Sequence, residues 1–323
     1  MENSQQHSQP PVYLQRWLTA IAERPKNTKK LTVVENGEVI GSLSLFIERN
    51  AIGMKQGYNP PWARLGGPWI RDGKTDHERT LIVRRLIRQL PTNVSYYLTL
   101  ANKFDYGIFL LEGFESDIEC NYAITPDRVP TLTDSFSSLT KRHLKQAQRS
   151  LIVSTTSPET FVSIYESNLY GRRRKSYAPI EIAHEILNEG LSRGQAKIFA
   201  AVRRDTKEID GAIACLWDDE RYYYWMTTRR QPASGQTRPH QGAVKLLLWS
   251  AIQDAAQRNL IFDFDGTPTH GAVRLYEGMG GLKTSRYRIT RKTTLERWIG
   301  RTRGPIKYLL KNTIGQFMTL KLN

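Results

Sequence analysis

The sequence predicts an α+β protein built from two tandem copies of a mixed, mostly antiparallel sheet flanked by helices. Three observations support this class. Short alternating or continuous apolar runs, typical of strands, are interspersed with longer runs whose apolar residues recur at i, i+3 and i+4, as in helices. Motifs of the first part return in the second at an offset of 165 to 170 residues. A length of 323 residues is enough for two ordinary domains.

The first copy is predicted to span residues 1–130. Its first helix covers about residues 12–23, and the Asn36-Gly37 turn joins two strands as a hairpin. A loop rich in Gly, Pro and Trp follows at residues 57–73. The strands are expected at residues 31–34, 38–48, 95–100 and 115–124, and two further helices at 75–90 and 104–112.

The second copy is predicted to span residues 131–295. Its helices are expected at residues 139–150, 158–170, 179–193, 239–258 and 270–277, and its strands at 196–203, 209–217, 221–228 and 261–265. The longest of these helices carries an apolar stripe and has Pro239 at its predicted first turn.

Two matched motifs indicate the duplication. Residues 110–113, Leu-Leu-Glu-Gly, correspond to residues 275–278, Leu-Tyr-Glu-Gly, at an offset of 165. Residues 38–43 correspond to residues 208–213 at an offset of 170. Their order is the same in both copies, which favours duplication over chance similarity.

Residues 296–323 are predicted to form a basic helical tail. A capping box at residues 293–296, Thr-Thr-Leu-Glu, begins a short helix, and from Pro305 onward apolar residues fall on one helical face. Three interpretations are open for this tail. It lies on anionic lipid, it directs its cations at RNA, or it packs on its own domain.

Composition excludes several classes of protein. No run approaches the roughly 18 apolar residues of a membrane helix, and the polar residues 1–11 do not resemble a signal peptide. Cys120 and Cys215 lack a neighbouring Cys or His at metal-ligand spacing. We therefore expect a cytoplasmic protein with reduced cysteines and no metal, in peripheral contact with the inner membrane face if the tail binds lipid.

The net charge of +16 is concentrated in two segments. Residues 141–175 carry eight Lys and Arg against two acids, and residues 283–323 carry eleven against one. Concentrated positive charge favours a polyanionic partner such as RNA. For residues 141–149 taken alone a solvated helix face is the slightly favoured alternative, whereas the four adjacent cations at residues 172–175 repel one another unless an anion is near. The predicted nucleic-acid contacts are Lys141, Arg142, Lys145, Arg172, Arg173, Arg174 and Lys175.

The segment from Arg238 to Gly281 holds the motifs that carry chemistry. A helix N-terminus and the end of a strand are predicted to meet there, where α/β proteins commonly bind ligands. The motifs are Leu247-Leu248-Trp249, Asp263-Phe264-Asp265-Gly266 and Leu275-Tyr276-Glu277-Gly278. They resemble the GNAT acyltransferases, and in particular the FemAB-like, peptidoglycan bridge-forming aminoacyltransferases. The resemblance covers about residues 12–295 and implies two tandem GNAT-like domains.

The resemblance implies catalytic roles for three residues. Tyr276 matches the tyrosine that protonates the leaving group in GNAT enzymes, and a phenol keeps its proton at neutral pH. Asp265 or Asp263 would orient or deprotonate the acceptor amine. A core tyrosine and solvated acids at a strand end are the alternatives from the sequence alone.

The donor is expected to be a co-substrate, either aminoacyl-tRNA or acyl-coenzyme A, with no permanently bound cofactor. Coenzyme A-dependent GNAT enzymes carry Gln/Arg-x-x-Gly-x-Gly/Ala before this helix, but here Pro239 lacks an N–H group and the pattern is broken. This departure favours tRNA. The predicted donor-binding residues are Arg238, His240, Gln241, Gly242 and Lys245.

The acceptor is expected in a cleft between the two copies. Aromatic rings and cations crowd the loop at residues 57–73, and such groups suit sugars and phosphates; a packed loop with Trp anchors is the alternative. The predicted acceptor-binding residues are Lys55, Tyr58, Trp62, Arg64, Trp69, Arg71 and Tyr224.

The sequence thus predicts an acyltransferase that moves an aminoacyl or acyl group from charged tRNA to an amine, such as a cell-wall or glycan precursor. One alternative is an acyl-coenzyme A-dependent N-acyltransferase in surface-glycan or lipid assembly. The other is a non-catalytic RNA-binding module on the same scaffold. The acceptor, the transferred group and the oligomeric state are not predicted.

Overall fold

A computed structural model describes residues 10–176, 178–232, 237–266 and 269–299. We call residues 10–124 the first half. It contains a 3₁₀ turn η1 (Val12–Leu14), helices α1 (Arg16–Ala22), α2 (Asp76–Arg88) and α3 (Lys103–Leu111), and strands β1 (Thr28–Glu35), β2 (Glu38–Arg49), β3 (Lys55–Tyr58), β4 (Trp69–Ile70), β5 (Ser95–Leu100) and β6 (Glu115–Ile124).

We call residues 126–278 the second half. It contains η2 (Pro126–Ser135), helices α4 (Ser138–Ser150), α5 (Pro158–Gly171), α6 (Ile180–Ser192), α7 (Ala243–Gln257) and α8 (His270–Gly278), and strands β7 (Leu151–Thr155), β8 (Ala196–Arg203), β9 (Ile209–Trp217), β10 (Arg221–Arg229) and β11 (Ile261–Asp263). The last strand, β12 (Leu282–Arg291), follows it and returns to the first half.

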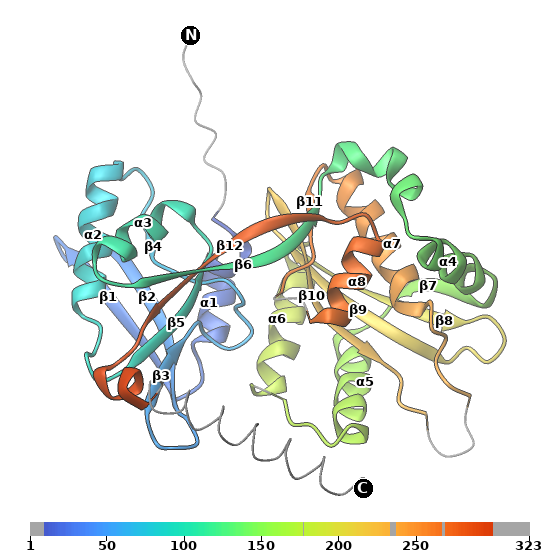
Figure 1. The fold of residues 1–323 in the computed structure, drawn as a ribbon, viewed down its shortest axis with the longest axis horizontal. Coiled ribbons are helices and arrows are strands. Elements are labelled where there is room, and N and C mark those ends of the chain that lie inside the picture. Colours follow the sequence, from blue (N-terminus) through green and yellow to red (C-terminus); the bar gives the residue numbers. More distant parts are fainter. Residues whose placement is uncertain (1–9, 177, 233–236, 267–268, 300–323) are drawn as a thin grey trace, which may run out of the picture.

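The strands of both halves join into one sheet (Figure 1). Its order is β1-β2-β3-β5-β12-β6-β11-β10-β9-β8-β7, with β4 paired to β2 beside this path. Most neighbouring strands are antiparallel, and the parallel pairs are β3 with β5 and β10 with β11. The predicted α+β class, with a mostly antiparallel sheet flanked by helices, is confirmed.

The two halves exchange their closing strands. Each half has a parallel strand pair followed by a helix and then a long strand. The long strand β6 of the first half pairs with β11, whereas β12 pairs with β5. β6 and β12 also pair with each other, and Figure 1 shows both of them crossing between the halves. The boundaries 1–130 and 131–295 remain a prediction.

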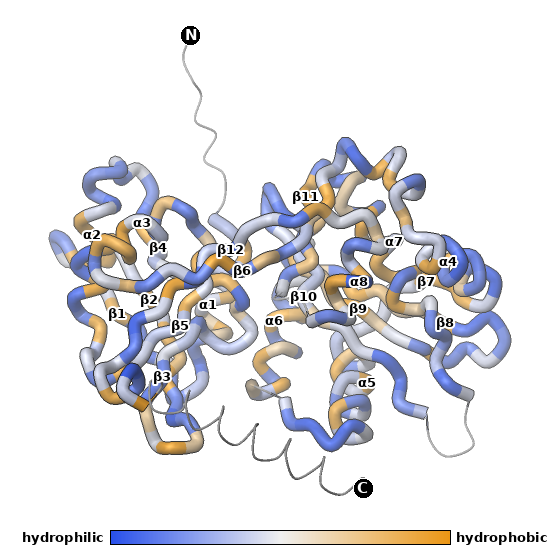
Figure 2. Tube along the Cα trace, viewed as in Figure 1, coloured by the Kyte–Doolittle hydropathy of each residue, from blue (hydrophilic) through white to orange (hydrophobic). Residues whose placement is uncertain are grey.

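Three helical layers bury the apolar cores. In the first half, α2 packs on β1 and β2 and buries residues such as Leu31, Leu43 and Leu86. In the second half, α7 covers one sheet face while α5 and α6 cover the other. Helix α1 packs on α6, so the beginning of the chain contributes to the core of the second half. Figure 2 shows how polar residues alternate with these apolar stretches along the chain.

Several predicted element boundaries need correction. The predicted strand at 261–265 ends at Asp263, and the helix predicted from Pro239 begins at Ala243. Strand β12 was not predicted, because its sequence, Leu-Lys-Thr-Ser-Arg-Tyr-Arg-Ile-Thr-Arg, has few apolar residues and depends on partners along both edges. The tail beyond residue 299 lies outside the described residues. Its predicted start is present, since the Glu296 N–H donates to the Thr293 hydroxyl at 3.3 Å.

The exchanged strands predict that both halves unfold together. Without the first half, β11 would lose its neighbour β6, and without β12, β5 would lose one of its two neighbours. Partial unfolding would therefore expose buried residues such as Ile289. We expect one urea transition with coincident midpoints for far-ultraviolet circular dichroism and for tryptophan fluorescence. Two separated transitions, each assigned to one half by hydrogen exchange, would contradict this expectation.

Candidate active site

The two parallel strands of the second half, β10 and β11, separate from each other after three residue pairs. Residues Arg221 to Tyr223 of β10 pair with residues 261–263 of β11, after which β11 ends while β10 continues to Arg229. Asp265 then adopts φ = +46°, a left-handed conformation that is uncommon for a residue other than glycine. The remainder of β10 therefore has backbone groups on this side that no strand of its own half pairs.

A loop of the first half fills part of the gap between β10 and β11. Trp62, itself at φ = +66°, donates from its indole Nε1 to the Pro179 carbonyl oxygen at 2.8 Å. In return, Trp225 Nε1 donates to the Trp62 carbonyl oxygen at 2.9 Å. The Arg64 Nη2 then donates to the Trp225 carbonyl oxygen at 3.1 Å. An arginine of the first half thus lies at the point where the strands of the second half part.

A buried network of charges supports this arginine. Asp265 is 3.5 Å from Arg64 Nε, and it also accepts a hydrogen bond from the Tyr13 hydroxyl. Arg286 Nη2 lies 2.8 Å from carboxylate oxygens of both Asp265 and Asp263. Burial raises the pKa of the Asp265 carboxyl, and the cations Arg286 and Arg64 oppose that shift.

Asp263 has partners of its own on three further sides. Asn121 Nδ2 donates to it at 2.7 Å, the Asp265 N–H at 2.8 Å and Arg221 Nη1 at 3.1 Å. Both aspartates are at least 97% buried. Buried carboxylates of this kind hold other groups in place. Asp263 also lines a separate cavity of about 680 Å³, together with its partners Asn121, Arg221 and Arg286.

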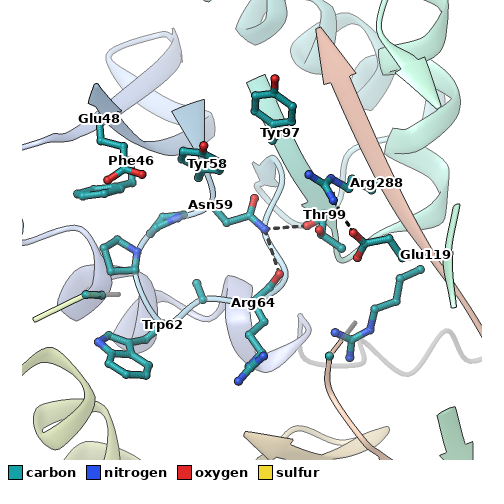
Figure 3. Close-up of a pocket in the computed structure, with 16 residues that line it drawn as sticks. Phe46, Glu48, Tyr58, Asn59, Trp62, Arg64, Tyr97, Thr99, Glu119 and Arg288 are labelled. Atoms are coloured by element: carbon teal, nitrogen blue, oxygen red, sulfur yellow. Dashed lines mark hydrogen bonds and ion pairs between the residues drawn. The ribbon is translucent and has the colours of Figure 1, made fainter. Parts of the chain in front are cut away.

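A cavity of about 440 Å³ lies over this network, between the halves (Figure 3). Arg64 and Trp62 lie on one side of it in the figure, and Arg288 with its partner Glu119, 2.7 Å away, lies on another. The rings of Tyr58 and Tyr97 stack with centroids 5.8 Å apart. The wall is completed by Phe46, Glu48, Asn59, Pro60, Pro61, Ala63, Thr99, Ala178, Gly266 and Arg286.

Tyr276 is buried and is not among the residues that line this cavity. Its ring stacks on Phe264 with centroids 4.3 Å apart and contacts Tyr122 at 5.8 Å. Burial raises the pKa of Tyr276 to about 12, with the nearby Arg64 guanidinium opposing the shift and Asp265 adding to it. Tyr276, Asp265 and Arg64 are therefore close enough to influence one another electrostatically.

The predicted donor-binding residues lie around the start of α7, and this helix N-terminus is covered. A Cβ atom added to Gly242 would lie 2.5 Å from the His143 carbonyl oxygen of α4. The Gly242 N–H donates to His240 Nδ1 at 3.0 Å, and the His240 N–H donates to Asp210 at 2.8 Å. Arg238 and Gln241 are exposed. The start of α7 is therefore occupied by α4 and by an internal imidazole.

Part of the predicted nucleic-acid set joins the donor set here. Lys245 of α7 lies with its Nζ 3.3 Å from His143 Nδ1. Burial lowers the pKa of His143, and the cations Lys245 and Arg142 lower it further. Arg142 and Lys145 are exposed on the same helix as His143, as is Lys141. We call Lys141, Arg142, Lys145 and Lys245 the α4–α7 basic surface. Residues Arg172 to Lys175 are exposed after the end of α5.

The predicted acceptor residues do not form a single site. Tyr58, Trp62 and Arg64 line the 440 Å³ cavity, whereas Trp69 and Arg71 line a second cavity within the first half. Lys55 lies on β3, and Tyr224 is buried in the apolar core of the second half. The loop at residues 57–73 separates the two cavities, so its cations and rings face two directions.

Sequence analysis missed the partners of the two aspartates. Tyr13, Asn121 and Arg286 lie 252, 142 and 23 residues from the acids that they contact. One signal was present, because an acid in a buried strand needs a buried cation or several donors. Nothing in the sequence identified which residues would supply them.

Over residues 10–176, 178–232, 237–266 and 269–299, no three His, Cys, Asp or Glu side chains are grouped as metal ligands would be. Within the same ranges, every helix is too short or too polar to cross a bilayer.

The candidate site is thus a sheet whose two parallel strands separate beside a helix, with a cavity over the gap. Residues 134–271 match the family model described as "Acetyltransferase (GNAT) domain". This segment, which is less than half of the chain, is therefore similar to a GNAT acetyltransferase domain. A comparison with curated proteins found no match.

Solved structures share the fold over most of the chain. FemX superposes with a TM-score of 0.58 at 12% identity, covering 85% of this chain and 91% of that one. The C-terminal domain of a putative lysylphosphatidylglycerol synthetase from Agrobacterium fabrum gives 0.55 at 9% identity, covering 91% and 93%. L-PGS from Bacillus licheniformis gives 0.54 at 11% identity, covering 88% and 90%. The predicted GNAT fold with FemAB-like neighbours is confirmed.

Proposed function

We propose that this chain transfers an aminoacyl group from charged tRNA to an amine held in the 440 Å³ cavity. The main support is Arg64, which reaches from the first half to the parted strands of the second half. A cation fixed at that point, with one wall of the cavity beside it, is placed to stabilise the negative charge of an acyl-transfer intermediate.

The proposed chemistry uses two side chains of this chain, Arg64 and Tyr276. The acceptor amine attacks the ester carbonyl of the donor, forming a carbon–nitrogen bond, and the bond to the ribose oxygen of tRNA breaks. Arg64 stabilises the oxyanion. Tyr276 does not line the cavity, so in this proposal the donor ester must extend past Arg64 to the Tyr276 hydroxyl; there Tyr276 gives its proton to the leaving oxygen, and the amine returns one proton to Tyr276. Asp263 and Asp265 act as positioning residues because their side chains are buried and hold Arg286 and Arg64.

The lining of the cavity supports a polar acceptor of mixed charge. Arg64, Arg286 and Arg288 supply cations, and Glu48 and Glu119 supply acids. The stacked rings of Tyr58 and Tyr97 offer an apolar platform beside them. A cell-wall or glycan precursor that carries an amine, hydroxyl groups and anionic groups matches this lining.

The start of α7 supports charged tRNA over coenzyme A. A pyrophosphate bound at this helix needs free backbone N–H groups, but Gly242 faces α4 and donates to His240. The α4–α7 basic surface offers cations to RNA phosphates instead. One similar structure is a putative lysylphosphatidylglycerol synthetase, a name that states a product carrying an aminoacyl group.

An acyl-coenzyme A-dependent N-acyltransferase is the second candidate. The observation that favours it is the match of residues 134–271 to an acetyltransferase domain. In this case the pyrophosphate would bind away from the covered start of α7, and α4 would not take part in donor binding.

Donor binding distinguishes the two candidates. We expect the full-length protein to retain charged tRNA on a filter, with affinity falling at least tenfold between 50 and 200 mM salt, as for binding through several phosphate contacts. The double variant Arg142→Gln/Lys145→Gln should weaken binding and flatten the salt dependence. Arg49→Gln, an exposed cation on β2, is the matched control and should change neither.

Binding of acetyl-coenzyme A without binding of charged tRNA would favour the second candidate. Retention of tRNA without transfer to any amine, together with wild-type affinity in Tyr276→Phe, would indicate an RNA-binding module. If neither donor binds, the proposal of an acyltransferase is wrong.

A further inference from the structure

A second cavity, of about 360 Å³, lies within the first half between the β1–β2 sheet face and α1. The loop at residues 57–73 closes one side of it, and Pro60 and Ala63 line both this cavity and the candidate active site. We call it the first-half cavity. It is a separate space that shares a wall with the proposed acceptor site.

Comparison of the two halves indicates that the fold does not require polar residues on this sheet face. In the first half, Lys30 pairs with Ser44 and Thr32 pairs with Ser42. The motif match at an offset of 170 places Ser42 and Ser44 at the positions of Ala212 and Ala214. The strand register then places Lys30 and Thr32 at the positions of Ile198 and Ala200, because these residues pair with Ala214 and Ala212.

The equivalent residues of the second half form a core. Ile198, Ala200, Ala212 and Ala214 are at least 99% buried and belong to one apolar cluster with residues of α6. The same face of the same fold is thus filled with apolar side chains in one half. In the other half it carries a lysine and three hydroxyl groups, and it borders an open space. Lys30 and Thr32 are exposed, Ser44 is half-buried and Ser42 is buried, so this polar face borders the cavity and is accessible to a ligand.

The charges of the lining select the class of ligand. Arg16, Lys30 and Arg71 contribute three cations, whereas Glu23 is the acid among the lining residues. Glu23 is already paired, with Lys30 at 3.0 Å and with the Ser44 hydroxyl. Arg71 reaches outward to Glu38. Lys30 is thus balanced by Glu23 and Arg71 by Glu38, so the lining with its ion-pair partners carries one net positive charge, from Arg16, and this charge favours an anion.

The uncharged lining favours a sugar. Trp69 offers an indole ring, and rings of this kind stack against the apolar faces of sugars. Ser42 is only 8% exposed and lines the cavity with its neighbour in register, Thr32. A buried hydroxyl can both donate and accept hydrogen bonds, which suits the hydroxyl groups of a sugar.

We propose that the first-half cavity binds an anionic sugar, with its phosphate or carboxylate group toward the cations Arg16 and Lys30 and its ring toward Trp69. The site is separate from the acyl-transfer function and does not depend on it. Tyr13 links the two, since it lines the first-half cavity and donates its hydroxyl hydrogen to Asp265. A ligand in the first-half cavity would therefore contact Tyr13, which is hydrogen-bonded to Asp265 in the buried network beside the candidate active site.

Calorimetric titration of the full-length protein tests this proposal, with glucose 6-phosphate and glucuronate as anionic sugars. Glucose and inorganic phosphate serve as the separate parts of the ligand. We expect both anionic sugars to bind at least tenfold more tightly than glucose or phosphate. Lys30→Met should weaken this binding about tenfold, the loss expected for a charge-assisted hydrogen bond of about 1.5 kcal/mol. Lys29→Met, on the opposite face of the same strand, should leave it unchanged.

Ser42→Val tests the cavity in a second way. Valine removes the hydroxyl group and adds volume at a residue that lines the cavity, so we expect loss of sugar binding with an unchanged thermal transition, followed by circular dichroism. Absence of binding by both anionic sugars, equal binding of inorganic phosphate, or an equal loss in Lys29→Met would each overturn the proposal. Activity with either acyl donor is not a readout, so failure here leaves the proposed acyl transfer untouched.

Discussion

Replacing Tyr276 with phenylalanine is expected to lower kcat for acyl transfer about 10²- to 10⁴-fold, the range for loss of a general acid. The ring keeps its stacking on Phe264 and its contact with Tyr122, so thermal stability should be nearly unchanged. Burial raises the pKa of Tyr276 to about 12, which means that the phenol keeps its proton in the folded protein across the neutral and mildly alkaline range.

Single-turnover transfer from charged tRNA measures this effect without product release. Because the charged phenolate is the disfavoured form, the wild-type rate should not fall through ionisation of Tyr276 below about pH 11. Tyr170→Phe, at a side chain that is 88% exposed, is the matched control and should transfer at the wild-type rate. A kcat within threefold of wild type in Tyr276→Phe would exclude this residue as the acid.

Replacing Asp263 with leucine is expected to lower the free energy of unfolding by about 3–5 kcal/mol. The carboxylate accepts from Asn121, Arg221 and Arg286 and from a backbone N–H, and leucine satisfies none of them. Arg286 is 8% exposed, so its charge would remain buried with Asp265 as its remaining acid partner. Urea unfolding at equilibrium gives the difference directly.

Asp117→Leu provides the comparison for that measurement. Asp117 lies at 4.0 Å from Arg288 with a side chain that is 57% exposed, and an exposed pair of this kind contributes about 0–1 kcal/mol. Similar losses in the two variants would show that the buried network does not stabilise the fold, and that Arg64 and Arg286 are held by other contacts.

The fold was predictable because its evidence is local. Asn36-Gly37 forms the expected turn, with φ values of +52° and +80°, and apolar periodicity located most helices and strands. Strand β12 could not be found in this way. Of its residues, Arg286 and Arg288 alternate with Tyr287 and Ile289. A strand so polar is stabilised by pairing with two strands, and its paired residues lie at least 159 positions earlier in the chain.

The candidate site was predictable only in part. Local motifs identified Asp263, Asp265 and Tyr276, and the crowding of rings and cations identified Trp62 and Arg64. No local pattern assigns Tyr13 to Asp265, because the pairing depends on how the start of the chain packs against the second half. For the same reason it was not expected that the loop at residues 57–73 lines two cavities. A sequence does not show which side chains of a loop face which cavity.

The paired crossing strands also bear on how substrates enter. Many two-part enzymes open and close on a hinge, with a few residues absorbing the rotation. Here β6 and β12 are hydrogen-bonded to each other and to both halves, so a rigid-body rotation would break ladder bonds over several residues. We therefore expect the cavity between the two halves to keep a nearly constant width, so that an acceptor must fit the existing opening. Adaptation to the acceptor would be confined to side chains and to the loop that carries Trp62 and Arg64.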